Sequence, residues 1–233
     1  MYKKIFFSTC LFLSFQIFSS SLNERQSFLI EHVKTSIKNA HLKRSKLNEE
    51  ILNLDGMSSD KVRYFLNNIC SLENGNYLEI GTWKGSTFIS ALYKNNLSSA
   101  IAIDNWSEFS GPKNTFLDNL SIFLPSTAYQ FYEIDSFNFD LSNIHNKINI
   151  YFYDGGHSQE QQKLAFTYYN SIFEDTFIAI VDDYNCDKVQ KGTQEAFQEL
   201  GYTILFEEYL PALYNGDKDN WWNGIYVAVI SKN

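Results

Sequence analysis

The sequence YLEIGTWKGSTFISALY, residues 77–93, combines an apolar strand, a turn with two glycines and the start of a helix. In a dinucleotide-binding turn a second glycine approaches the pyrophosphate, but Trp83 stands at that position here. Gly81 and Gly85 still let the backbone come close to a ligand, and the helix from Ser86 offers backbone N–H groups to a carboxylate. The segment therefore predicts a site for a small molecule without a pyrophosphate.

Strands and helices alternate along the chain on both sides of this segment. From the apolar runs we expect five strands, at residues 76–80, 99–104, 129–134, 148–154 and 177–182. Helical patterns separate them, beginning at residue 86 and covering residues 114–123, 159–172 and 187–200. Such apolar strands form a parallel sheet that helices cover on both faces, an α/β doubly wound fold. Two last strands, within residues 202–211 and 224–231, have no helix between them and should pair antiparallel at the sheet edge.

The N-terminal 55 residues differ in character from the rest. Residues 1–21, MYKKIFFSTCLFLSFQIFSSS, have two lysines, an apolar run and small residues, the layout of a secretory signal peptide. They predict a secreted or periplasmic protein or, if the segment is kept, one associated with a membrane through this anchor. Residues 22–55 show helical spacing of apolar positions, so we expect a helical cap packed outside the core of one α/β domain, residues 56–233.

Composition narrows the range of partners. The 233 residues carry a formal net charge of −8, and no stretch rich in lysine and arginine is interleaved with aromatic residues, so nucleic acid is not an expected partner. Cys10 lies in the leader, and Cys70 and Cys186 are expected to be buried thiols rather than a disulfide. The sequence leaves open whether the chain forms a homo-oligomer.

Polar residues follow the second and third predicted strands. Ligands of open parallel sheets bind beyond the carboxyl ends of the strands, so these positions are informative. Asp104 ends the second strand, and its carboxylate could accept both hydroxyls of a ribose or cap a helix. Asp135 and Ser136 follow the third strand, where they could bind an adenine amino group and ring nitrogen or form an exposed turn.

The fourth and fifth strand ends carry a group of carboxylates. Asp154 follows one strand, and Asp182 and Asp183 follow the other. Neighbouring strands lie about 4.8 Å apart, so these carboxylates would converge within reach of one hard cation if the strands are adjacent. Magnesium is the natural choice for oxygen ligands, and ordinary turn and capping aspartates are the alternative. His157, three residues after Asp154, could act as a general base beside the cation or lie on the surface.

Together these motifs resemble a known family. YLEIGTWKGSTFISAL, AIDNW, YDGGHSQEQ and IVDDY are similar to class I S-adenosylmethionine-dependent methyltransferases, in the small-molecule O-methyltransferase branch that includes macrocin-type and catechol O-methyltransferases. The resemblance covers residues 56–233 and implies a Rossmann-like sheet of order 3-2-1-4-5-7-6 with strand seven antiparallel, and S-adenosylmethionine as cofactor. It assigns Glu79, Gly81 and Gly85 to the methionine part, Asp104 to the ribose, and Asp135 and Ser136 to the adenine, and Ser86 at the start of the helix is also expected to bind the cofactor.

The resemblance also implies a metal site. Metal-dependent members use ligands that match Asp154, Asp182 and Asp183, and their base, often a lysine, stands where this chain has His157. The resulting hypothesis is divalent-metal-assisted methylation of a hydroxyl on a small molecule such as a sugar or polyketide, in a pocket shaped by residues 23–54 and the loop around Trp221 and Trp222. The alternative is an exported, non-catalytic protein that binds a nucleoside or a metal on the same scaffold, because S-adenosylmethionine is made in the cytosol. A nicotinamide dehydrogenase is disfavoured by Trp83.

Overall fold

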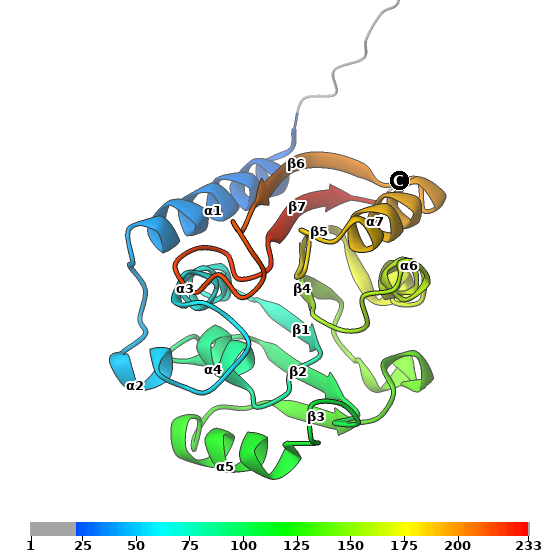
Figure 1. Ribbon diagram of the computed structural model, residues 1–233. Helices are drawn as coiled ribbons and strands as arrows, with labels where there is room; N and C mark the ends of the chain where they lie inside the picture. The colour runs from blue at the N-terminus through cyan, green and yellow to red at the C-terminus, as the bar shows by residue number, and fades with distance from the viewer. Residues whose placement is uncertain (1–21, 233) are drawn as a thin grey trace, which may run out of the picture.

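The computed structural model describes residues 22–232, so the predicted signal peptide or anchor of residues 1–21 lies outside the described residues. The chain folds around one seven-stranded sheet of order β3-β2-β1-β4-β5-β7-β6 (Figure 1). The strands are β1 Asn76–Ile80, β2 Ser99–Asp104, β3 Gln130–Glu133, β4 Ile148–Tyr153, β5 Phe173–Val181, β6 Thr203–Leu210 and β7 Ile225–Ser231. β7 pairs antiparallel with β5 and β6, and the other pairs are parallel. The predicted strand order and antiparallel seventh strand are confirmed.

Helices cover both faces of this sheet. They are α1 Glu24–His41, α2 Glu49–Leu52, α3 Asp60–Ile69, α4 Ser86–Leu92, α5 Lys113–Phe123, α6 Gln159–Thr167 and α7 Asp187–Glu199. In Figure 1, α1, α3 and α4 lie on one side of the sheet, and α6 and α7 lie on the other. No helix among residues 22–232 is long and apolar enough to cross a membrane.

The core is divided by the sheet into two apolar clusters. Successive strand residues point to opposite faces, so Ile150 and Phe152 of β4 join the cluster under α1, α3 and α4. Tyr151 and Tyr153 of the same strand pack under α6 and α7. All six residues of β4 are buried, which is why this strand has no polar alternation in the sequence.

The predicted helical cap is formed by α1 and α2. Asn23 begins α1 with a capping box, in which its side chain accepts a hydrogen bond from the backbone of Gln26 and the Gln26 side chain accepts one from the backbone of Asn23. The buried face of α1 joins the first apolar cluster through Leu29, Ile30, Val33, Ile37 and Ala40. This helix is therefore packed into the domain and does not stand apart from it as a spacer.

β5 begins four residues earlier than the sequence predicts, at Phe173 instead of residue 177. The helix before it ends at Thr167, and a short 3-10 turn, η3 Asn170–Ile172, replaces its expected last turn. The sequence FEDT, residues 173–176, is too polar to be recognised as the start of an apolar strand. In the structure Thr176 pairs with Ser231 at the far end of β7. Cys70 and Cys186 are free thiols; Cys70 is buried as expected, whereas Cys186 is half-buried.

Candidate functional site

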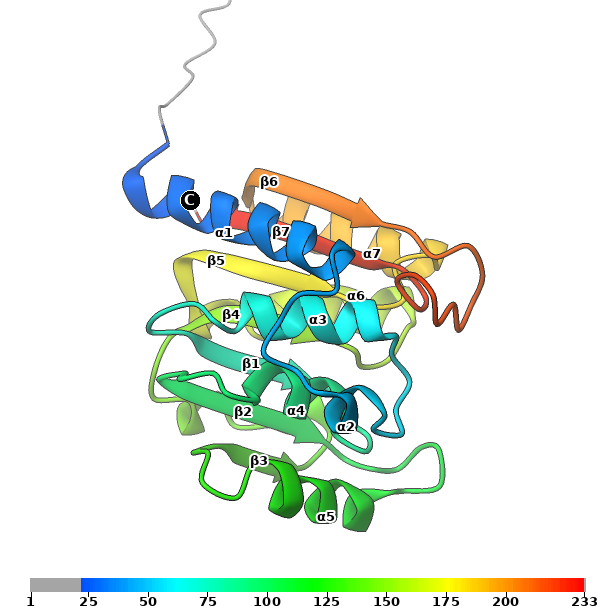
Figure 2. The same ribbon diagram turned by 90° about the vertical axis from the view of Figure 1, so that its left-hand side faces the viewer.

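A cavity of about 670 Å³ lies beyond the carboxyl ends of the parallel strands. Figure 2 shows β1 and β2 pointing to the side of the molecule from which the connecting loops project. Eight of the eleven residues predicted to form the site line this cavity: Gly81, Asp104, Asp135, Ser136, Asp154, His157, Asp182 and Asp183. They follow five different strands, so the fold itself brings them together. The cavity lining does not include Glu79, Gly85 or Ser86.

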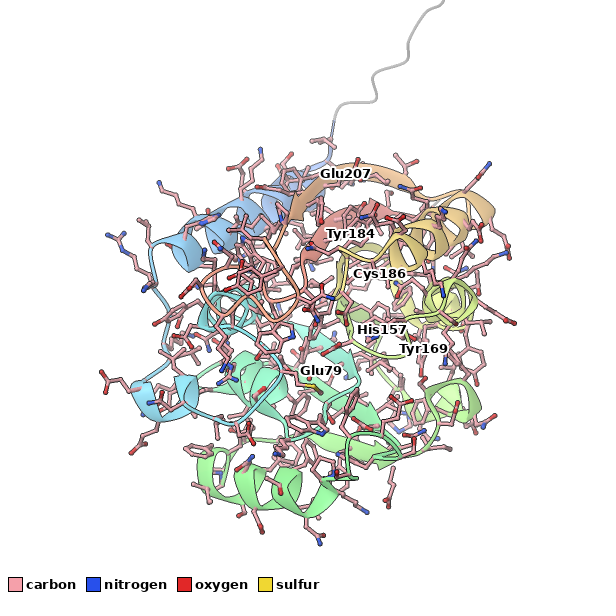
Figure 3. The ribbon with its side chains drawn as sticks, in the orientation of Figure 1. Glu79, His157, Tyr169, Tyr184, Cys186 and Glu207 are labelled. Carbon is pink, nitrogen blue, oxygen red and sulfur yellow. The ribbon has the colours of Figure 1, made fainter. Side chains whose placement is uncertain are left out.

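Glu79, which was expected to contact a cofactor, does not reach the cavity. Its side chain is 0% exposed and accepts hydrogen bonds from the Tyr77 hydroxyl and, at 2.6 Å, from the Thr87 hydroxyl. Figure 3 labels Glu79, which lies on β1, and His157, which lies in the loop after β4. Burial raises the pKa of Glu79 to about 8, although the two hydroxyls oppose the shift. The role of Glu79 is therefore corrected from ligand contact to a link between β1 and α4 beneath the turn.

Gly85 and Ser86 also have structural roles in place of the expected cofactor contacts. Gly85 precedes α4 with a φ of 83°, and a Cβ there would lie 2.9 Å from the Phe116 ring. The space freed by this glycine is occupied by the aromatic side chain of Phe116. Ser86 is 6% exposed, and its hydroxyl lies 3.4 Å from that of Ser58. Gly85 and Ser86 thus pack the turn between β1 and α4 against the protein interior.

The buried Glu79 carboxyl makes stability dependent on pH. A carboxyl whose folded pKa is raised to about 8 contributes stability that is fully present below its unfolded pKa of about 4.3 and is lost as the pH rises through 8. We expect the free energy of unfolding to fall by a few kcal/mol between pH 5 and pH 9 and Glu79→Gln to flatten this fall. Denaturant unfolding at several pH values measures it. An equal fall in wild type and Glu79→Gln would show that other groups cause it.

Asp104 organises the turn that opens the cavity. Its Oδ2 accepts hydrogen bonds from the backbone N–H groups of Thr82 and Trp83, both at 2.8 Å, and its Oδ1 accepts one at 2.7 Å from the backbone of Trp106. A carboxylate oxygen accepts about two hydrogen bonds, so Oδ2 is saturated and Oδ1 can take one more. Asp104 lines the cavity as expected, but it retains capacity for one ribose hydroxyl and not for two.

Gly81 is required for the contact between the β1 turn and the end of β4. Its φ is 83°, and an added Cβ would lie 1.9 Å from the backbone oxygen of Asp154. Gly81 therefore lets Asp154 approach β1, where the Asp154 N–H donates a hydrogen bond to the Ile80 carbonyl at 2.8 Å. The close approach expected of this glycine is thus made to the protein backbone.

We expect Gly81→Ala to lower the free energy of unfolding by at least about 3 kcal/mol, because it combines an unfavourable φ with a backbone clash. Gly216→Ala is the matched control. Gly216 also lines the cavity with a φ of 76°, but nothing lies within 4 Å of its added Cβ. Its cost should be limited to about 1 kcal/mol from the backbone conformation. Equal losses in thermal or denaturant unfolding would contradict the assigned contact.

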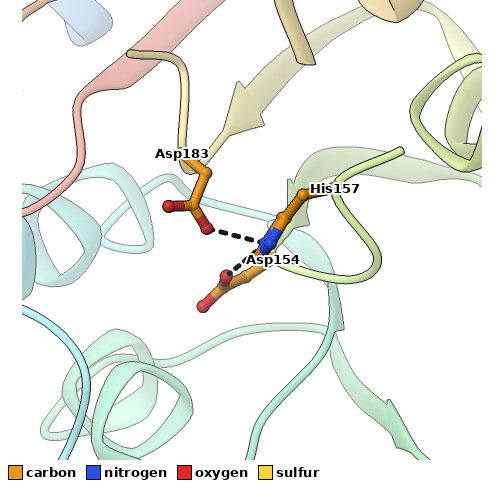
Figure 4. A group of neighbouring side chains, drawn as sticks. All are labelled: Asp154, His157 and Asp183. Carbon is orange, nitrogen blue, oxygen red and sulfur yellow. Dashed lines mark ion pairs between the residues drawn. The ribbon is translucent and has the colours of Figure 1, made fainter. Parts of the chain in front are cut away.

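The carboxylates after β4 and β5 lie together with His157 (Figure 4). The His157 Nε2 is 2.6 Å from Asp183 Oδ2 and 4.0 Å from Asp154 Oδ1. Asp154, His157 and Asp183 each present one ligand atom, and these atoms all lie within 4.8 Å of one another. Asp182 is 6% exposed, and its Oδ1 has no hydrogen-bond partner among the described residues. An orphaned buried oxygen beside two further carboxylates suits a divalent cation.

Electrostatics in this group favours a bound positive charge. Burial, followed by repulsion from Asp182 and Asp183, raises the pKa of Asp154 well above its usual range. Burial and the Asp183 charge raise the pKa of Asp182 in the same way. The hydrogen bond to Asp183 is the largest cause that raises the pKa of His157. In the absence of a cation, the raised pKa values mean that Asp154, Asp182 and His157 bind protons more readily than usual, which reduces the negative charge of the cluster.

Asn223 contacts this cluster and was missed in the sequence. Its Nδ2 donates to Asp183 Oδ1 at 2.6 Å, and its Oδ1 accepts from the Gly216 N–H at 2.7 Å. The loop between β6 and β7 is held by Asp217, whose carboxylate accepts from the backbone of Leu213, Asp219 and Asn220. The spacing of Asp217 to Asn220 is typical of a turn and could have predicted the loop shape. The contact between Asn223 and Asp183 links residues 40 positions apart and has no local signal.

The aromatic residues expected around the acceptor are divided between rim and core. Trp222 lines the cavity, with a φ of 58°, whereas Trp221 is 3% exposed and packs against Phe65 and His41. No described residue from positions 23–54 lines the cavity, and Met57 is the nearest contribution from that end. The N-terminal helices thus do not line this cavity, and their expected part in an acceptor pocket stays a prediction. The β6–β7 loop and the loop after β2 contribute to the lining of the cavity.

No model of a known protein family matches the chain, and no curated protein matches it. Solved structures share its fold. The O-methyltransferase from Bacillus cereus in complex with SAH has a TM-score of 0.54 at 13% identity, over 88% of this chain and 91% of that chain. TrmN from Thermus thermophilus has a TM-score of 0.54 at 9% identity, and the match covers 79% of this chain and 52% of TrmN. The small RNA methyltransferase HEN1 has a TM-score of 0.51 at 15% identity, and the match covers 74% of this chain and 25% of HEN1.

These likenesses establish the fold of the chain. It is the Rossmann-like fold of class I methyltransferases, with the same seven-stranded order and antiparallel seventh strand that the sequence predicts. Identities of 9% to 15% do not carry an acceptor from one protein to another. The function must therefore be argued from the residues of this cavity.

Proposed function

We propose that this chain is an S-adenosylmethionine-dependent methyltransferase that methylates a hydroxyl group of a small molecule with the assistance of a divalent cation. The observation that carries the proposal is the convergence of side chains from five strand ends on one cavity of about 670 Å³. Three carboxylates and an imidazole lie together in this cavity, and the glycine turn after β1 opens into it. A site of this size and polarity suits a nucleoside cofactor together with a small acceptor.

The ends of β1, β2 and β3 would hold S-adenosylmethionine. The Asp104 Oδ1 has one remaining acceptor position for a ribose hydroxyl. Asp135 uses one carboxylate oxygen to cap a short 3-10 turn, since Oδ1 accepts from the Phe137 N–H at 2.9 Å, and this leaves Oδ2 for an adenine amino group. The cofactor carries no phosphate, which agrees with Trp83 at the position where a pyrophosphate would need glycine.

The ends of β4 and β5 would hold a divalent cation, preferably magnesium, on Asp154, Asp182 and Asp183. When bound, S-adenosylmethionine would supply the methyl group, and the cation would lower the pKa of the acceptor hydroxyl. The fit is supported by the orphaned Asp182 Oδ1 and by the raised pKa of Asp154, because both indicate a need for positive charge. Asn223 would keep Asp183 in place through its 2.6 Å hydrogen bond.

His157 would act as the general base. Its imidazole stands at the cavity with 48% of the side chain exposed, so an acceptor hydroxyl can reach it. Asp183 accepts a hydrogen bond from Nε2 at 2.6 Å and stabilises the imidazolium that forms when the ring takes the proton. The chain would thus position an acceptor, take its proton on His157 and keep the resulting charge close to Asp154, Asp182 and Asp183, the carboxylates that would hold the cation.

Binding of S-adenosylhomocysteine to the full-length protein tests the cofactor assignment. We expect calorimetry to give a dissociation constant in the micromolar range and no heat with NAD, because Trp83 excludes a pyrophosphate. A folded protein that binds NAD and not S-adenosylhomocysteine would contradict the proposal. Binding of S-adenosylhomocysteine without methyl transfer to any hydroxyl acceptor would favour the non-catalytic scaffold.

A further inference from the structure

The cavity has an unusually one-sided charge. Six carboxylates line it: Asp104, Glu108, Asp135, Asp154, Asp182 and Asp183. No lysine or arginine lines it among residues 22–232, and His157 is the one imidazole in its lining. A divalent cation and the sulfonium of the cofactor would add three positive charges and a protonated His157 a fourth, which is still fewer than the six carboxylates of the lining. The part of the cavity left for an acceptor therefore remains negative.

Three lysines near the cavity, Lys61, Lys84 and Lys113, are bound to other groups. Lys84 lies 2.6 Å from Asp55 and 4.2 Å from the centre of the Trp83 ring. Lys113 pairs with Glu133 across the surface of α5 and β3. Lys61 donates to the Asn220 side chain at 3.0 Å. None of these three lysines lines the cavity, so an acidic group on an acceptor would meet no lysine or arginine in the described lining and would be repelled by the carboxylates that do not hold the cation.

Glu108 is the carboxylate placed to act on an acceptor directly. It lies in the exposed loop after β2 and lines the cavity, and no side-chain hydrogen bond or ion pair involves it among the described residues. It lies close enough to His157 for their charges to interact. It does not belong to the carboxylate cluster after β4 and β5, so its charge is not used to hold a cation.

Aromatic rings surround the same space. Trp83, Trp106, Phe109 and Trp222 line the cavity, and Phe109 is 61% exposed. The faces of aromatic rings attract organic cations and are indifferent or unfavourable to anions. These rings and the unpaired Glu108 therefore favour the same charge on a ligand; Trp106 and Phe109 share the loop of Glu108, whereas Trp83 and Trp222 come from other parts of the chain.

We propose that the acceptor is a phosphate-free hydroxyl compound that is neutral or carries a basic nitrogen, and that Glu108 selects for this positive charge. The inference rests on the proposed methyltransferase function, because it concerns the acceptor side of the same cavity. It excludes nucleotides, coenzyme A thioesters and RNA as acceptors, since each carries phosphates that the lining would repel.

Three catechols that differ in the charge of one ring substituent test this inference. Dopamine, 4-methylcatechol and 3,4-dihydroxyphenylacetate present the same two hydroxyls with a positive, neutral or negative side chain. Their binding is measured by calorimetry on the full-length protein saturated with S-adenosylhomocysteine and magnesium. We expect dopamine to bind at least about tenfold more tightly than 3,4-dihydroxyphenylacetate, with 4-methylcatechol between them. Glu108→Gln should narrow this ratio, and Glu108→Lys should reverse the order.

Glu160→Gln is the matched control, because Glu160 is an exposed acid on α6 that does not line the cavity. It should leave the tenfold ratio unchanged. If the loaded protein binds the three catechols equally, prefers the anion, or does not bind dopamine, the inference is overturned while the cofactor assignment stands. If S-adenosylhomocysteine itself does not bind, the proposed function fails first, and the two failures are therefore distinguishable.

Discussion

Asp182→Asn should reduce the affinity for magnesium by at least about 100-fold, and it should make the metal-free protein more stable at pH 8. The substitution keeps the shape of a side chain that is 6% exposed and removes its charge. Burial raises the folded pKa of Asp182, so wild type loses stability as the pH rises from the unfolded value of about 3.9 through the raised folded value. Asparagine has no proton to lose, so the gain should be large at pH 8 and absent below pH 4.

A loss of magnesium affinity together with a gain in stability would show that Asp182 favours metal binding and destabilises the metal-free protein. Magnesium affinity is measured by calorimetry, and stability by thermal unfolding in a chelator. Asp175→Asn is the matched control, because Asp175 lies on the same strand, β5, at the end away from the cavity and is exposed. It should change neither quantity appreciably. Unchanged magnesium affinity in Asp182→Asn would remove this residue from the proposed metal site.

His157→Ala should lower kcat by about 10²- to 10⁴-fold while the affinity for S-adenosylhomocysteine stays within about threefold of wild type. The imidazole lies beside Asp183 at the carboxylate end of the cavity, away from the strand ends assigned to the cofactor. The rate is measured with methyl-labelled S-adenosylmethionine and the hydroxyl acceptor that gives the highest rate with wild type.

Added imidazole should restore part of the lost rate, because 48% of the His157 side chain is exposed and its removal leaves a space that solvent can enter. His145→Ala serves as the control, since His145 is exposed and does not line the cavity. An unchanged kcat in His157→Ala would mean that another group, or water, takes the proton. A lower rate with no rescue and weaker cofactor binding would assign His157 a structural role instead.

The fold could be predicted from the sequence because its signals are local. β1, β2 and β4 and the second half of β5 are short, largely apolar runs, and helical patterns of apolar positions lie between strands. The start of β5 was missed because Glu174 and Asp175 are polar, and because the pairing there is made with other strands, Phe173 with Ile148 of β4 and Thr176 with Ser231 of β7. Strand ends supported by a distant partner are not visible in a window of neighbouring residues.

The site was predicted where topology alone brings residues together. Asp154 and Asp182 lie close because each follows a strand of one parallel pair, β4 and β5. Glu79 was assigned wrongly because its direction depends on which face of β1 packs under α4, and burial is a tertiary property. Asn223 was missed because the antiparallel β7 brings its start to the edge where the other strands end, and the sequence gives no sign of this contact with Asp183.

A crystal structure of the full-length protein with S-adenosylhomocysteine and Mn²⁺ tests the central claim most directly, because the anomalous signal of manganese locates the cation. We predict a manganese peak among Asp154, Asp182 and Asp183, and S-adenosylhomocysteine across the ends of β1, β2 and β3 with its ribose at Asp104. A cavity that contains neither molecule at saturating concentrations, or manganese bound elsewhere on the protein, would contradict the account.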